Sequence, residues 1–201
     1  MSPRKLLPAL LVVFSAFASQ YAKANTVTGT FNTDDQVNFY TTTLTSSQTF
    51  NVNTTSYAAG GFDPVLTLFY ANGSPIAPSM TGGTADPVTG LSNDAYISQL
   101  LGPGTYLLSL SEFPNGATNG ANDPFLFAGM GNFTPSLCPG STGTSFLESD
   151  VAPCVQRTGN FAFTSNVTLA PAATVTPEPA TWILVLPATG LLLAFGKRSI
   201  A

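Results

Sequence analysis

The side chains that could do chemistry in this chain are acidic, and almost no base accompanies them. The sequence contains no histidine, and its lysines are confined to Lys5, Lys23 and Lys197. Serine and cysteine nucleophiles depend on a neighbouring base such as histidine or lysine. No glycine-rich loop has the spacing that holds phosphates. Carboxylates are therefore the reactive groups that remain between residues 25 and 176.

Nine acidic residues lie between residues 25 and 176 against the single base Arg157, which gives this segment a net charge of −8. Nucleic acid is therefore not expected as a partner, because it binds clustered lysine and arginine. A carboxylate pair can hydrolyse glycosides, but nine acids make some close pair a matter of chance, and we expect no enzyme. Calcium binds carboxylate and carbonyl oxygens. We predict a weak calcium site at Asp63 and Asp94, with a plain solvated surface as the alternative.

The N-terminal segment, residues 1–24, has the features of a cleavable signal peptide. A basic pair is followed by an apolar run too short for a comfortable membrane span, and then by small residues at Ala22 and Ala24. Signal peptidase requires small residues of this kind next to its cleavage site. We expect the chain to be exported and to begin at Asn25 when mature, with an uncleaved N-terminal anchor as the alternative.

Cys138 and Cys154 are the only cysteines. A single pair in an exported chain favours a disulfide. Closing a loop of about 15 residues would contribute roughly 3 kcal/mol. A zinc or redox site is excluded by the spacing of the two cysteines and by the lack of histidine.

The elements that must position these groups are strands. Residues 25–170 show many short runs of period-two alternation and no long helical periodicity. Asn72-Gly73 is typical of a tight hairpin turn. About eight short strands predict an all-β fold, an antiparallel β-sandwich of jelly-roll-like type, followed by a linker at 171–176. The expected strands cover residues 36–44, 62–71, 95–101, 105–111, 125–127 and 160–169, with others around Phe50 and Ile76.

Two sets of runs in this region resemble known families. FDPVLTLFYANGSPIA and NDAYISQLLGPGTYLLSLSEF resemble the bacterial pre-peptidase C-terminal (PPC) domain, a small calcium-associated β-sandwich of exported proteins. GNFTPSLC, FLESD and CVQRTGNFAF resemble a related group of PEP-CTERM ectodomains.

Tyrosine side chains are candidates for binding a carbohydrate. If exposed, Tyr57, Tyr70 or Tyr96 could stack on sugar rings.

The C-terminal segment, residues 177–201, contains two overlapping sorting patterns, Pro177-Glu178-Pro179 and LPATG. Only five apolar residues separate LPATG from the Gly-Lys-Arg of the basic end. They would rise about 8 Å as helix against a hydrocarbon core of about 30 Å, so LPATG would lie inside the bilayer. Residues 180–196 would rise about 25 Å, enough for a thin membrane. Lys197 and Arg198 would then remain cytoplasmic.

This tail resembles the PEP-CTERM sorting signal, in which Pro177, Glu178 and Pro179 form the motif. The resemblance implies recognition by exosortase in the envelope of a Gram-negative bacterium, and an association with exopolysaccharide and biofilm. We therefore expect a non-enzymatic protein of the cell surface or extracellular matrix, processed by signal peptidase and exosortase. The alternatives are a polysaccharide- or calcium-binding surface module, and an uncut tail anchor.

Overall fold

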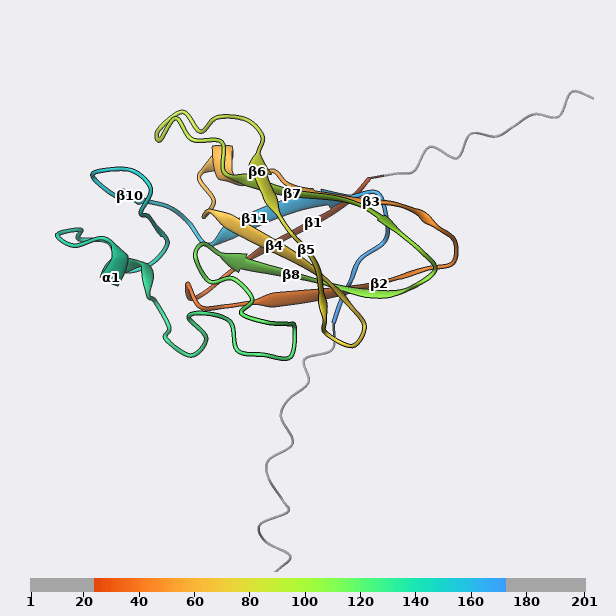
Figure 1. The fold of residues 1–201 in the computed structure, drawn as a ribbon. Coiled ribbons are helices and arrows are strands. Elements are labelled where there is room, and N and C mark those ends of the chain that lie inside the picture. Colours follow the sequence, from red (N-terminus) through yellow and green to blue (C-terminus); the bar gives the residue numbers. More distant parts are fainter. Residues whose placement is uncertain (1–23, 173–201) are drawn as a thin grey trace, which may run out of the picture.

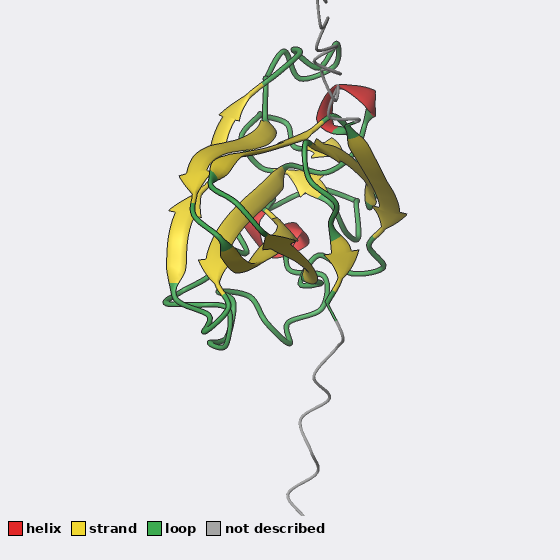
Figure 2. Cartoon of the chain, turned by 90° about the vertical axis from the view of Figure 1, so that its right-hand side faces the viewer, coloured by secondary structure: helices red, strands yellow, loops and turns green. Residues whose placement is uncertain are grey.

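The computed structural model describes residues 24–172, which form two five-stranded antiparallel sheets. The expected all-β sandwich is therefore confirmed, whereas the signal peptide (except Ala24), most of the linker and the sorting segment lie outside the described residues. Within residues 24–172, no helix has the length and apolarity needed to cross a membrane. Figure 1 shows the strands of both sheets running across the domain, and Figure 2, turned by 90°, shows the strands surrounding the interior of the domain.

The first sheet has the order β1-β11-β3-β7-β6, so the first and last long strands are neighbours. The second sheet has the order β12-β2-β8-β4-β5. The strands of the first sheet are β1 (Asn25–Thr30), β11 (Asn160–Ser165), β3 (Gln48–Thr54), β7 (Asp94–Leu101) and β6 (Met80–Gly82). Those of the second are β12 (Ala170–Pro171), β2 (Asn38–Leu44), β8 (Gly104–Glu112), β4 (Pro64–Tyr70) and β5 (Pro75–Pro78).

The core lies between the two sheets because alternate residues of each strand point inward. In β3, Phe50 and Val52 are buried while their neighbours are exposed. β8 is the central strand of its sheet and is almost wholly buried along its second half. The resulting core is rich in aromatic rings, including a contact between Tyr40 and Phe163 with ring centroids 5.0 Å apart.

The predicted hairpin at Asn72-Gly73 is present and joins β4 to β5. Gly73 has a φ of 88°, a conformation that favours glycine. Its amide donates to the carbonyl of Tyr70 at 2.9 Å, and the amide of Tyr70 donates to the carbonyl of Ser74 at 2.9 Å. The turn therefore fixes the pairing of Phe69 with Pro75, and the register shifts by one residue between Phe69 and Leu68.

A long excursion, residues 113–159, separates β8 from β11 and carries the disulfide. It contains the short helix α1 (Thr134–Leu137) and the two-stranded sheet of β9 (Leu147–Glu148) and β10 (Val155–Gln156). The predicted bond between Cys138 and Cys154 is confirmed, with Cα atoms 6.0 Å apart. Figure 1 shows α1 and β10 together at one end of the sandwich. We call the segment from Cys138 to Cys154 the disulfide ring.

The strand predictions need correction in two respects. Residues 125–127 are not a strand: Phe125 forms an isolated bridge with Ala117, and Phe127 lies in a turn and stacks on Phe133 with ring centroids 4.2 Å apart. The strands β1, β6, β9, β10 and β12 were not predicted. β1 alternates half-buried and exposed residues, so its sequence has little apolar contrast.

Candidate metal centre

Three carboxylates meet where the disulfide ring contacts the sandwich. Asp63 immediately precedes β4, Glu148 lies in β9, and Asp150 follows two residues later. One carboxylate oxygen from each lies within 4.8 Å of the others. Asp63 and Glu148 are buried and Asp150 is exposed, so the cluster opens to solvent on the side of the ring.

Glu112 is a buried acid beside this cluster. It ends β8 and pairs with Pro64 across the sheet, and the amide of the next residue donates to the carbonyl of Asp63 at 2.8 Å. The side chain is only 2% exposed, and its Oε2 has no hydrogen-bond partner among the described residues. Burial raises the pKa of Glu112 to about 10, helped by the charges of Asp34, Asp63 and Glu148.

Asp63 is also difficult to ionise. Burial raises its pKa to about 8, and the nearby charges of Glu148 and Asp150 act in the same direction. The side-chain amide of Asn93 opposes this by donating to Oδ2 at 3.0 Å. These acids therefore retain protons near neutral pH unless a cation replaces them.

Glu148 is held by a buried phenol. The hydroxyl of Tyr57 donates to Oε2 of Glu148 at 2.7 Å, and the amide of Asp150 donates to Oε1 at 3.1 Å. Tyr57 lies in the 3-10 helix η1 (Tyr57–Ala59) and is fully buried, and this burial raises its pKa. The hydroxyl proton therefore remains on Tyr57 and keeps one carboxylate oxygen in place.

Arg157, the single base of this domain, is buried and makes an ion pair and hydrogen bonds within the domain. Its Nη1 lies 3.0 Å from Oδ2 of Asp86, and both side chains are almost fully buried. Its guanidinium lies 4.2 Å from the centre of the Tyr57 ring. It also donates to the carbonyl of Gly61 at 2.9 Å and to the carbonyl of Tyr57. Arg157 therefore fixes the backbone and ring of Tyr57, which in turn positions Glu148.

The structure brings Asp63 into a cluster but does not bring Asp94 into it. Oδ1 of Asp94 accepts from the hydroxyl of Thr54 at 2.8 Å and from the amide of Tyr57 at 3.1 Å. Glu148, Asp150 and Glu112 were not predicted as ligands. The FLESD run was a usable signal, because two acids two residues apart lie inside the Cys138–Cys154 loop.

The cluster offers oxygen atoms only. Carboxylate oxygens suit hard cations such as Ca²⁺ and Mg²⁺, whereas zinc and copper sites use nitrogen or sulfur. A buried carboxylate oxygen without a partner is costly, and a cation would satisfy it. The residues present therefore fit a hard divalent cation.

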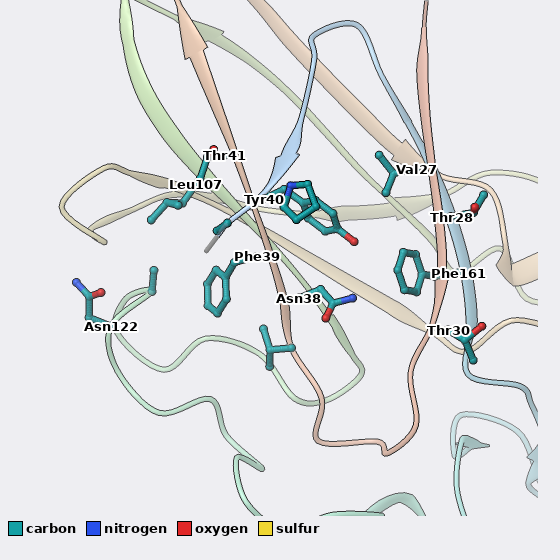
Figure 3. A pocket seen from close by; sticks show the side chains of 15 residues that line it. Val27, Thr28, Thr30, Asn38, Phe39, Tyr40, Thr41, Leu107, Asn122 and Phe161 are labelled. Carbon is teal, nitrogen blue, oxygen red and sulfur yellow. The ribbon is translucent and has the colours of Figure 1, made fainter. Parts of the chain in front are cut away.

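A second feature is a groove of about 980 Å³ between β1 and β2, at the free edge of the first sheet. Figure 3 shows the rings of Phe39 and Phe161 on either side of the amide of Asn38. None of the residues that line the groove is charged, although the domain is strongly acidic. Of the tyrosines considered for sugar stacking, Tyr57 is buried and is excluded, whereas Tyr70 and Tyr96 are partly exposed.

Comparison with known proteins finds similarity among solved structures. No family model matches the chain, and no curated protein is similar to it. Among solved structures, the chain is similar to the pre-peptidase C-terminal domain of a collagenase from Bacillus anthracis. The two share 13% identity with a TM-score of 0.38, over 72% of this chain and 89% of that chain.

Proposed function

We propose that this chain is an exported, non-enzymatic protein of the cell surface or extracellular matrix whose sandwich binds a calcium ion. Asp63, Glu148 and Asp150 would supply the ligands, with Glu112 behind them. The observation that carries the proposal is the convergence of three carboxylate oxygens within 4.8 Å beside the unpartnered buried Oε2 of Glu112.

Calcium suits the cluster better than magnesium does. Calcium accepts six to eight oxygen ligands in flexible geometry, whereas magnesium requires a near-ideal octahedron and keeps several waters. Asp63 precedes β4, Glu148 lies in β9 and Asp150 follows β9, which is an irregular arrangement of ligands. Extracellular calcium modules bind with dissociation constants of about 10⁻⁴ to 10⁻³ M, and we expect this range here.

Export and processing rest on the two ends of the sequence. The signal peptide and the PEP-CTERM tail would deliver the domain through signal peptidase and exosortase, with exopolysaccharide as the surrounding partner. Mass spectrometry of the mature protein tests this proposal: we expect an N-terminus at Asn25 and a C-terminus near Pro177-Glu178-Pro179. A mature chain that still ends at Ala201 would refute processing of the tail.

The calcium proposal is tested by titrating the purified domain with calcium in a calorimeter and by recording melting curves with calcium or chelator. Calcium at about 10–100 times its dissociation constant would add about 1.4–2.7 kcal/mol of stability, or roughly 3–10 °C in Tm. D63N should abolish both signals, whereas D123N, which changes an exposed acid outside the cluster, should keep them. Coincident melting curves of the wild-type domain would refute the site.

A second candidate function is the binding of a neutral polysaccharide in the groove between β1 and β2. The specific observation is a lining of aromatic, amide and threonine side chains without charge in a domain of net charge −8. Uncharged glycans should bind and uronate-rich glycans should not. Selective binding of the uronate-rich glycans would contradict this candidate.

A further inference from the structure

We infer that the cation and the Cys138–Cys154 disulfide stabilise each other, so that the calcium site is complete only in the oxidised chain. This inference rests on the proposed calcium function and adds its regulation by the redox state of the cysteines.

The ligands come from the two sides of one contact. Glu148 and Asp150 lie inside the disulfide ring, whereas Asp63 lies in the sandwich at the start of β4. A cation that binds all three joins the ring to the sandwich. The geometry of the site therefore depends on how closely the ring is held against β4.

Part of the ring is fixed without any cation. Oδ1 of Asp34 accepts from the amide of Phe146 at 2.7 Å, and the amide of Leu147 donates to the hydroxyl of Thr134 at 3.0 Å. The antiparallel pairing of Glu148 in β9 with Val155 in β10, just outside the ring, joins the two ends of the segment 149–154. The contacts fix the stretch up to Glu148 on both sides.

Asp150 is held much less firmly. Its amide donates to Oε1 of Glu148 at 3.1 Å, but its side chain is exposed and residues 150–153 form a run of bends. Cys154 follows four residues later and is tied by its disulfide to Cys138 next to α1. Opening the disulfide would free Cys154 from α1 and leave residues 149–154 closed only by the pairing of Glu148 with Val155, and binding a cation would then require further ordering of Asp150.

The cost of that ordering appears as weaker binding. A disulfide restricts the conformations of the loop that it closes, so the ligands of the oxidised chain are already near their bound positions. We expect the dissociation constant for calcium to rise at least about tenfold on reduction, because free loops bind with the added loss of conformational entropy. Linkage is reciprocal, so calcium must favour the disulfide by the same factor.

The first experiment compares calcium binding by the oxidised wild-type domain with binding by the C138S/C154S double variant. We expect a dissociation constant at least about tenfold higher in the variant. Absence of binding to the oxidised domain would refute the calcium site itself, and the coupling with it. Equal affinity in the two proteins would refute the coupling alone and leave the calcium function standing.

A second measurement keeps the test valid if the double variant folds poorly. The wild-type domain is equilibrated in mixtures of reduced and oxidised dithiothreitol, where one dithiothreitol becomes its cyclic disulfide as the Cys138–Cys154 bond becomes two thiols. Saturating calcium should raise the ratio of reduced to oxidised reagent needed for half reduction by about tenfold. D63N keeps the disulfide but lacks the sandwich ligand, so calcium should not shift its midpoint. An unshifted wild-type midpoint, or an equal shift in D63N, would overturn the inference.

Discussion

The phenol of Tyr57 donates a 2.7 Å hydrogen bond to Oε2 of Glu148, which links the 3-10 helix of the sandwich to the disulfide ring. The same hydroxyl lies 3.2 Å from the hydroxyl of Thr89. A single buried side chain thus connects the acidic cluster with the loop between β6 and β7.

Y57F should destabilise the domain and weaken calcium binding. The variant keeps the ring under Arg157 but leaves Oε2 of the buried Glu148 carboxylate without its donor, while Oε1 keeps the amide of Asp150. A hydrogen bond to a charged group contributes about 1.5–3 kcal/mol, so chemical denaturation should show a loss of that size. Y70F is the matched control, because Tyr70 is 51% exposed, and it should change neither stability nor affinity. Unchanged calcium affinity in Y57F would show that Glu148 needs no positioning.

E112Q should separate the effect of charge from that of shape. Burial raises the pKa of Glu112 to about 10, so its carboxyl is protonated at neutral pH in the absence of a cation. Glutamine has the same shape and no charge, and we expect the melting temperature in chelator to change little. The stabilisation by calcium should fall, because the neutral amide can no longer provide a negative charge behind the three ligands. Full stabilisation of E112Q by calcium would remove Glu112 from the site.

The stability of the calcium-free domain should decrease as pH rises. The pKa values of Asp63 and Glu112 rise on folding from 3.8 and 4.5 to about 8 and about 10. Their protonated forms therefore contribute stability that is complete below about pH 4 and is lost as pH rises toward the folded pKa values. Melting curves in chelator between about pH 5 and 8 should show this trend. D63N should flatten it, and a Tm that rises over this range would contradict the prediction.

Calcium should oppose the loss of stability at higher pH, because the ion and the protons compete for the same carboxylates. The increase in Tm that calcium produces should grow between about pH 5 and 8 as the protons leave. Calorimetry in buffers of different ionisation enthalpy should detect protons released on binding. Binding that does not depend on pH over this range would place the ion away from Asp63 and Glu112.

R157M should cost about 3–5 kcal/mol, the usual effect of removing one partner from a buried ion pair. Burial opposes ionisation of Asp86, but hydrogen bonds from Thr89 and Arg157 outweigh it and hold the pKa of Asp86 below its ordinary value. Asp86 would remain buried without its partner in the variant. R157M/D86N should recover part of the loss, and urea unfolding of the three proteins measures the difference. No recovery would assign the loss to the contacts of Arg157 with Tyr57 and Gly61.

The sequence predicted those parts of the fold that local patterns determine. The hairpin between β4 and β5 follows from Asn72-Gly73 between two apolar runs, and the disulfide follows from a single cysteine pair in an exported chain. The strand expected over residues 160–169 is also present in its first part, as β11 (Asn160–Ser165). The residues that determine the hairpin and the strand are close in sequence, and each cysteine has no other cysteine with which to pair.

The rest depends on contacts that period-two patterns do not contain. Phe125 and Phe127 form a short apolar run that suits a strand as well as a packed turn, and their partners Phe39 and Phe133 lie in other segments. The metal centre also depends on contacts between segments that are far apart in the sequence. Asp63 was expected as a ligand from the sequence, but Glu148 reaches it only through the folding of the disulfide ring.

The burial of Arg157 also affects the susceptibility of this domain to extracellular proteases. Between residues 24 and 172 it is the only lysine or arginine, and it is 5% exposed. Enzymes with trypsin-like specificity cut after these residues, and the native domain presents none of them on its surface. We expect digestion by trypsin to report global unfolding of the domain, because cleavage must wait until the ion pair with Asp86 has opened.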